Sequence, residues 1–285
     1  MSVVEVTDLK KSFGRKVVLN GISFTVEKGE VFGFLGPNGA GKTTTFKMLT
    51  GQLKPKGGQA SLLGMDIVKN VEKVQGEMGV CFETTNLYEQ MSALENLNLF
   101  ASLFGIRSFD GNALLERVDL GGRGKDRVET YSKGMKQHLM VARAILNKPR
   151  LLFLDEPTAG LDPTSSEKIR NIILEERERG ATVFLTTHDM LEADKLSDRV
   201  AFMNQGKIVA LDTPHQLKQQ HGKRALKAKV AGDNGVLEDR EINLDTPETP
   251  EAVRKLFSQE QVITIHSEEA TLEDIFISLT GRGLV

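Results

Sequence analysis

The segment GPNGAGKTT contains the residues whose types and spacing point most directly to chemistry. Its three glycines allow backbone conformations that turn several N–H groups inward, and they leave room for a phosphate. An apolar, strand-like run precedes the segment and a helical pattern follows it, so the helix would present its unpaired N–H groups and positive dipole end to the same anion. A glycine turn without a ligand is the alternative interpretation. The residues predicted to hold the phosphate chain of a nucleotide are Gly36, Pro37, Asn38, Gly39, Ala40, Gly41, Lys42, Thr43 and Thr44.

Two acidic residues further along the chain supply what phosphoryl transfer still requires. The apolar run Leu151–Leu154 ends in Asp155 and Glu156, and such a run is typical of a buried strand in a parallel sheet. We expect Lys42 to reach the β- and γ-phosphates and the Thr43 hydroxyl to bind Mg²⁺. Asp155 would hold the metal shell and Glu156 would polarise an attacking water. An isolated Asp-Glu pair would more simply cap a turn, but together with the phosphate loop it indicates nucleotide hydrolysis.

Composition excludes several classes of protein. The 285 residues are 39% hydrophobic and 27% charged, which is ordinary for a soluble globular protein with one large and one small domain. A net charge of −2 argues against a nucleic-acid surface, so no nucleic-acid partner is expected. The single cysteine, Cys81, cannot form an intrachain disulfide and suits a reducing compartment. No apolar run approaches the ~20 residues of a membrane span, so any membrane role is expected to depend on a partner.

The order of the predicted elements favours an α/β fold with a mixed or parallel sheet, because strand-like runs alternate with helical patterns. The first 35 residues resemble instead a small antiparallel sheet, with runs at 3–6, 17–19 and 22–26 and a hairpin turn at Asn20-Gly21. Residues 87–146 are predicted to form a helical subdomain in which Ser132 caps a helix.

The composition changes after His221, and residues 222–285 are predicted to form a small α+β domain. The expected order is a strand from Ala225, a helix over 251–258, a strand over 261–266 and a final helix over 272–279, with Gly232–Gly235 as a loop. The basic residues Lys223, Arg224, Lys227 and Lys229 are predicted to lie on a solvated strand face.

From residue 1 to about 221 the chain resembles the nucleotide-binding subunit of ATP-binding cassette (ABC) transporters. GPNGAGKTT resembles the Walker A loop, LLFLDE the Walker B strand, TAGLD the D-loop and YSKGMKQ the signature motif, in the order that the family uses. His188 falls at the position of the switch histidine, and Phe13 at that of the base-stacking aromatic. The resemblance implies a P-loop ATPase core that binds ATP with Mg²⁺ and uses His188 at the γ-phosphate.

The resemblance also implies two partners. In the family, two cassettes pack head to tail, so Ser132, Lys133 and Gly134 of the signature would contact the nucleotide held by a second cassette, the same or different. A separate membrane permease would be moved by this dimer through a helix seated near residues 83–104, with the cassette on the cytoplasmic face of the membrane. The signature variant and the tail TLEDIFISLTGRGL resemble a subfamily that exports drugs, antibiotics, lipids or ions, and whose C-terminal domain braces the dimer.

Three residues depart from the family pattern. Lys133 adds a charge within the signature, and Phe13 replaces the usual tyrosine but keeps a stacking face. Glu83 stands where the family has the glutamine of the Q-loop, which touches Mg²⁺ and senses the permease. Glu83 is therefore predicted to be a metal ligand that carries a full negative charge, and a solvent-exposed loop glutamate is the alternative.

Three other functions remain as alternatives. A soluble ABC ATPase of translation or DNA repair would usually carry two cassettes or a long coiled-coil insertion, and the sequence has neither. A GTPase would need a guanine-reading Asn-Lys-x-Asp, which Asn147-Lys148-Pro149-Arg150 only approaches. A nucleotide-binding module without turnover would not need Glu156.

Overall fold

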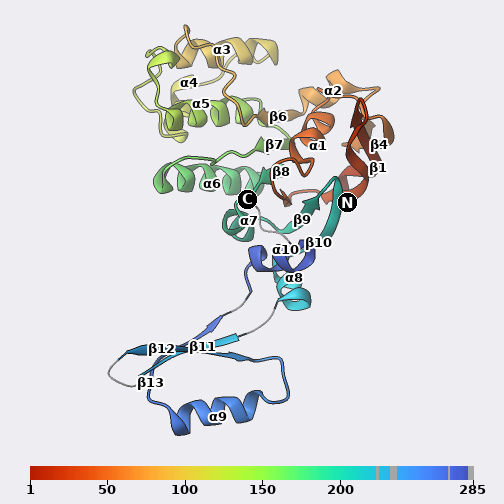
Figure 1. Ribbon diagram of the computed structural model, residues 1–285. Coiled ribbons are helices and arrows are strands. Elements are labelled where there is room, and N and C mark those ends of the chain that lie inside the picture. Colours follow the sequence, from red (N-terminus) through yellow and green to blue (C-terminus); the bar gives the residue numbers. More distant parts are fainter. Residues whose placement is uncertain (223–224, 232–235, 269, 282–285) are drawn as a thin grey trace. The chain divides into compact units, whose positions relative to one another are not determined.

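The computed structural model describes residues 1–222, 225–231, 236–268 and 270–281 (Figure 1). The chain divides into two compact units, Met1–Leu211 and a second unit that begins at Asp212. The predicted boundary at residue 221 left helix α8 (Pro214–His221) in the first unit. In the structure, α8 belongs to the second unit, because it packs against α10 (Leu272–Thr280) of that unit.

A six-stranded sheet forms the centre of the first unit, with strand order β10-β9-β3-β8-β7-β6. Strands β6, β7, β8, β3 and β9 are paired in parallel, which confirms the predicted sheet. Every residue of β3, β7 and β8 is buried, because helices and a second sheet cover both faces. The strands are β3 (Val31–Leu35), β6 (Met78–Cys81), β7 (Leu151–Asp155), β8 (Thr182–Thr187), β9 (Arg199–Asn204) and β10 (Lys207–Asp212).

Alternation along these strands divides the apolar side chains between two cores. Phe153 joins a cluster of phenylalanines on one face, where its ring lies 5.4 Å from that of Phe184. Its neighbours Leu152 and Leu154 face the other core, which the helices complete. The main helices of the unit are α1 (Lys42–Leu49), α2 (Val71–Gly76), α6 (Pro163–Glu178) and α7 (Met190–Leu196).

An antiparallel sheet of order β2-β1-β4-β5 covers the phenylalanine core, as predicted for the N-terminal segment. The hairpin turn predicted at Asn20-Gly21 is wrong, because the strands run on and the chain turns at Gly14-Arg15. Gly21 has a φ of 77° within β2, where the register shifts between Leu9↔Ile22 and Lys10↔Asn20. A left-handed glycine therefore makes a bulge here instead of a turn. The strands are β1 (Ser2–Phe13), β2 (Lys16–Glu27), β4 (Gly57–Leu62) and β5 (Met65–Asp66).

The predicted helical subdomain contains three helices, each of which begins at a side-chain cap. Ser92 and Glu95 form a capping box, Asp110 accepts two backbone N–H groups, and Ser132 accepts the N–H of Met135 as expected. The helices are α3 (Ala93–Leu103), α4 (Gly111–Arg117) and α5 (Lys133–Ile145), and a 3₁₀ turn covers Val128–Thr130. Their buried faces complete the second core.

The second unit contains a three-stranded antiparallel sheet of order β12-β11-β13. Lys227 and Lys229 are exposed on β11 while Ala228 and Val230 are buried, which confirms the solvated face for these two lysines. Lys223, Arg224 and the predicted loop Gly232–Gly235 lie outside the described residues. Strand β12 was not predicted, because charged residues hide its alternation. The elements are β11 (Ala225–Ala231), β12 (Leu237–Asn243), α9 (Thr249–Gln259) and β13 (Val262–Glu268).

No helix in the described part of the chain has the length and apolar character needed to span a membrane.

Candidate active site

The glycine loop joins the end of β3 to the start of α1, as the sequence predicts. Gly36 has a φ of 154°, and a Cβ there would approach the carbonyl oxygen of Met203 to 2.3 Å. Only glycine allows this approach between the loop and β9. The loop is further fixed by a 2.9 Å hydrogen bond from the Gly206 N–H to the carbonyl of Ala40. The Lys42 ammonium folds back and donates to the Gly36 carbonyl at 2.5 Å, so the loop encloses its own cation.

Lys42, Glu156 and His188 meet at the carboxyl ends of β3, β7 and β8. The Lys42 Nζ lies 3.5 Å from Glu156 Oε1, and both side chains are less than 10% exposed. The Nδ1 of His188 lies 2.7 Å from Glu156 Oε2, while the His188 side chain remains 52% exposed. One carboxylate therefore contacts both the phosphate-loop cation and the histidine.

Glu156 is also held in a demanding backbone conformation. Its φ of 50° lies in the left-handed region, which is unusual for a residue other than glycine. The Glu156 N–H donates to the carbonyl of Thr186 at 3.0 Å, which ties this conformation to the end of β8. Backbone strain of this kind concentrates at functional sites because the surrounding structure must maintain it.

Asp155 lies beside Glu156 and is less accessible to solvent, with an exposed fraction of 3%. Burial raises the pKa of Asp155, and the charge of Glu83 raises it further, whereas a hydrogen bond from the Thr186 hydroxyl opposes the shift. Glu83 itself is exposed, two residues after the end of β6. The sheet thus brings the two predicted carboxylate metal ligands within electrostatic reach of each other.

The residues present fit a magnesium ion. Mg²⁺ takes oxygen ligands and usually binds through one or two carboxylates together with substrate phosphates. Asp155 offers carboxylate oxygen, and Thr43 offers a hydroxyl in the first turn of α1. The described residues contain no group of three His, Cys, Asp or Glu side chains placed for a metal, so an all-protein metal cage is not formed there.

The predicted signature residues lie at a different place in the unit. Ser132, Lys133 and Gly134 line a hollow of about 320 Å³ at the start of α5, together with Asp162 and Ser165. None of the phosphate-loop residues lines this hollow. The signature and the phosphate loop of one chain therefore do not form one pocket in the first unit.

Phe13 is the last residue of β1 and is 51% exposed. The ammonium of Lys11 lies 5.2 Å from the centre of its ring, so one face of the ring is next to a cation. The exposed ring shows that Phe13 does not belong to the hydrophobic core.

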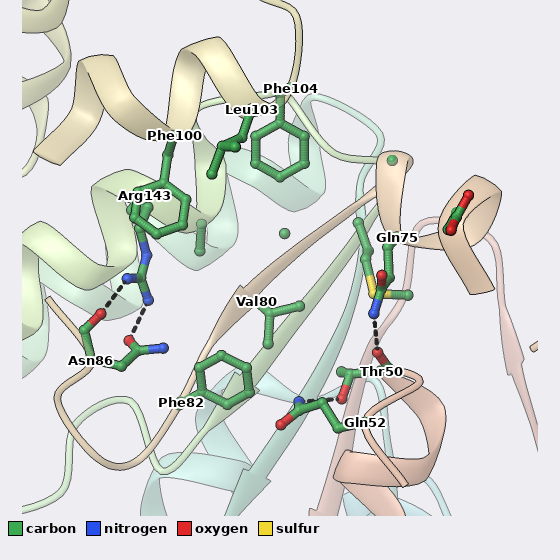
Figure 2. Close-up of a pocket in the computed structure, with 15 residues that line it drawn as sticks. Thr50, Gln52, Gln75, Val80, Phe82, Asn86, Phe100, Leu103, Phe104 and Arg143 are labelled. Carbon is green, nitrogen blue, oxygen red and sulfur yellow. Dashed lines mark hydrogen bonds between the residues drawn. The ribbon is translucent and has the colours of Figure 1, made fainter. Parts of the chain in front are cut away.

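Two groups of residues near the site were only partly predicted from the sequence. The buried side chains of Thr187 and Glu192 form a hydrogen-bonded group with the partly buried Thr158, next to His188. A groove of about 450 Å³ lies between the sheet and the helical subdomain. Figure 2 shows Phe100, Leu103 and Phe104 on one side of this groove and Phe82 and Val80 on the other. The groove includes Phe100, Leu103 and Phe104 of the segment 83–104, where the permease helix is predicted to sit, but its lining from the sheet was not predicted. No motif marked Glu192.

The sequence is similar to those of known proteins over most of its length. The family model for ABC transporters matches residues 19–159. A fluoroquinolones export ATP-binding protein of Mycobacterium tuberculosis is 45% identical over 266 residues, which cover 93% of this chain and 88% of that protein. The bacitracin transport ATP-binding protein of Bacillus licheniformis is 33% identical, over 100% of this chain and 99% of that protein.

Solved structures show the same fold. The structure of an ATP-binding subunit of an ABC transporter matches with a TM-score of 0.71 and 31% identity, over 77% of this chain and 93% of that one. An ATP-binding cassette in its ADP conformation matches with a TM-score of 0.67 and 27% identity, over 76% and 92%. These matches confirm the predicted fold class and the family resemblance. The chain belongs to the ABC transporter family, as an ATP-hydrolysing subunit of the exporter type.

Proposed function

We propose that the meeting of Lys42, Glu156 and His188 is the hydrolytic site of this ATPase. The observation that supports this most is the 3.5 Å contact between Lys42 and Glu156, because it places the predicted base next to the predicted phosphate ligand. Lys42 would leave Glu156 for the β- and γ-phosphates when ATP enters the glycine loop. Glu156 would then be free to accept the proton of the attacking water.

His188 would act at the γ-phosphate end of the nucleotide. Its ring already contacts Glu156 at 2.7 Å and is half exposed, so it can turn toward a ligand without unpacking the core. Thr43, Asp155 and Glu83 would hold Mg²⁺, which when bound neutralises charge on the phosphates. Phe13 would stack on the adenine, because its ring is exposed and flat faces attract nucleobases.

A second cassette would complete the site. Cassette dimers are expected for this family, and in this chain the signature hollow and the glycine loop are separate. We propose that Ser132, Lys133 and Gly134 of one cassette contact the ATP held by the other. The start of α5 suits this role, since its unpaired N–H groups attract an anion.

The groove in Figure 2 would receive a helix of the permease. Its lining is largely apolar, and Leu103 is 72% exposed, so a partner side chain can bury apolar surface there. The guanidinium of Arg143 closes one end, stacked 4.6 Å from the centre of the Phe100 ring and bonded to the Asn86 carbonyl at 2.9 Å. Glu83 precedes Asn86 by three residues, so movement in the groove can reach the metal site. The subunit would then lie at the cytoplasmic face of the membrane.

The cargo of the transporter is inferred from relatives. Proteins that are 45%, 33% and 32% identical to this chain are named for fluoroquinolone export, bacitracin transport and linearmycin resistance. We propose an antibiotic-like organic molecule as the cargo. Deleting the chain together with its permease should lower the inhibitory concentration of such compounds, and restoring both with Glu156→Gln should not recover resistance.

Glu156→Gln is also the biochemical test of the site. The amide keeps the shape of the side chain but cannot accept the proton, so turnover should fall by at least about 100-fold. ATP should then hold a closed dimer that elutes earlier in gel filtration, and ADP should not. Glu77→Gln is a suitable control, because Glu77 is a half-exposed carboxylate at the opposite end of the sheet, just before β6. Normal turnover by Glu156→Gln would assign the base to another residue.

A further inference from the structure

A buried carboxylate lies behind the histidine and has no part in the mechanism described above. Glu192 is in the first turn of α7 and is only 3% exposed. Burial raises its pKa, while hydrogen bonds from two threonine hydroxyls oppose the shift. A carboxylate is rarely buried without specific partners, because desolvation is costly. Its partners therefore indicate why it is there.

The two oxygens of Glu192 bond to two different loops of the active site. Thr158 donates to Glu192 Oε1 at 2.7 Å, and Thr187 donates to Glu192 Oε2 at 3.3 Å. Thr158 is two residues after Glu156, in the segment that leads to Asp162. Thr187 directly precedes His188. One side chain thus connects the loop behind the proposed base to the loop that carries the histidine.

The direction of the hydrogen bond from Thr187 is fixed by the neighbouring backbone. The Thr187 hydroxyl accepts the N–H of Asp189 at 3.0 Å, so its own hydrogen is directed to Glu192. Asp189 in turn accepts the N–H groups of Leu191 and Glu192, which anchors the start of α7. Glu192 is thereby held by its backbone and by both carboxylate oxygens. Such a group has little freedom to move independently of the two loops.

We infer that Glu192 is a positioning residue that couples the loop at Thr158 to His188, so that a displacement of one loop shifts the other. This inference rests on the proposed hydrolytic site. The Thr158 loop contains the predicted D-loop, and the signature hollow is lined by Gly160, Leu161 and Asp162 of the same loop. Arrival of a second cassette at that hollow would then be transmitted through Thr158 and Glu192 to the histidine. Neither threonine needs to touch ATP for this to occur.

The test is a double-mutant cycle on ATP turnover. Thr158→Val and Glu192→Ala each remove one partner, and each is expected to lower kcat by about tenfold, the effect of losing one hydrogen bond to a charged group. The KM for ATP should stay within about twofold, because the glycine loop is unchanged. The double variant should be little worse than either single variant, since both remove the same connection.

Conservative and surface variants distinguish positioning from general stability. Glu192→Gln retains an oxygen and adds an N–H donor in the same place, so it should recover most of the lost kcat. Leu191→Ala changes a side chain on the same helix that is 64% exposed, and should leave kcat unchanged. Circular dichroism and a melting curve on each variant establish that the protein being assayed is folded. A purely structural role would lower the melting temperature of Glu192→Ala without changing kcat per folded molecule.

Two results would overturn the inference. Full kcat in folded Glu192→Ala would show that the connection is not used, and additive losses in the double variant would show that the two residues act separately. Both results are distinct from failure of the hydrolytic site itself. That failure would appear as normal turnover in Glu156→Gln, and it would overturn the proposed site and this inference together.

Discussion

Removing the charge of Glu156 should tighten ATP binding as well as stop turnover. Lys42 and Glu156 face each other at 3.5 Å and are 5% and 8% exposed. At an effective dielectric constant of about 20, the attraction between two unit charges at that distance is about 5 kcal/mol. ATP competes with this pair, because the same ammonium must move to the phosphates. The pair therefore opposes nucleotide binding in the empty site.

Only part of that attraction contributes to the net effect, because desolvation of both groups offsets much of it. A net change of about 1.4 kcal/mol, less than a third of the Coulomb value, corresponds to a tenfold lower dissociation constant. Glu156→Gln also removes a negative charge that would repel the γ-phosphate. Both effects act in the same direction, so we expect ATP to bind at least about tenfold more tightly.

The assay measures the ATP dissociation constant by calorimetric titration of nucleotide-free protein with ATP. The protein concentration is kept below that at which dimers form. Glu156→Gln without nucleotide should also melt at a lower temperature than the wild type, because it leaves the buried Lys42 without its carboxylate partner, and ATP should reverse this loss. His188→Ala serves as the control, since it removes the other contact of Glu156 and preserves the ion pair. An unchanged ATP dissociation constant in folded Glu156→Gln would refute the competition between Glu156 and the phosphates.

Three further predictions concern other parts of the chain. Glu83→Gln should lower the Mg²⁺ concentration for half-maximal turnover a few-fold, since one charge beside the phosphates is lost, and identical Mg²⁺ titrations would favour a solvent-exposed role for Glu83. If the second unit braces a dimer, ending the chain after Leu211 should preserve ATP affinity but raise the protein concentration needed for turnover. Loss of ATP binding in the folded remainder would contradict that bracing role. Burial raises the pKa of Cys81 to about 12, so its thiol should resist alkylation at pH 8 until denaturant is added, and rapid labelling of native protein would contradict this burial.

Much of the site was predictable because its chemistry is carried by contiguous motifs. A glycine loop between a buried strand and a helix has few other uses. The strand that ends at Asp155, directly before Glu156, is recognisable from its apolar run alone. The sheet then brings these segments together, since parallel strands end at one edge.

The features that were predicted wrongly or missed from the sequence share a physical cause, since each depends on contacts between distant parts of the chain or on a weak local pattern. Asn20-Gly21 is a strong turn signal, but a left-handed glycine also serves a bulge, and only the pairing of β1 with β2 decides between the two. Strand β12 carries charges on most positions, so its hydrophobic pattern is weak. Glu192 was missed because it lies in no recognised motif and its bond to Thr158, the first residue of TAGLD, joins residues 34 positions apart. The groove likewise depends on how α3 lies against the sheet.

The most direct test of a nucleotide site shared between two cassettes is whether two defective chains complement each other. Lys42→Ala damages the phosphate loop, and Gly134→Asp places a negative side chain at the proposed signature contact. A Cβ at position 134 would lie 3.5 Å from its nearest neighbour, the Ser165 hydroxyl, which is an ordinary van der Waals contact, and circular dichroism on Gly134→Asp checks that the whole side chain is accommodated. Each variant alone should have negligible ATPase activity, because both of its sites are damaged.

Mixing the two variants in equal amounts should restore activity. If the cassettes pair head to tail as equal subunits, half of the dimers in the mixture contain one chain of each variant. In such a mixed dimer, one of the two sites is intact, because it combines the Lys42 of one chain with the unchanged signature of the other. One quarter of all sites are then intact. We therefore expect about a quarter of wild-type turnover. Substantial activity in folded Gly134→Asp alone, or no recovery in mixtures that form dimers, would contradict a site shared between two copies of this chain.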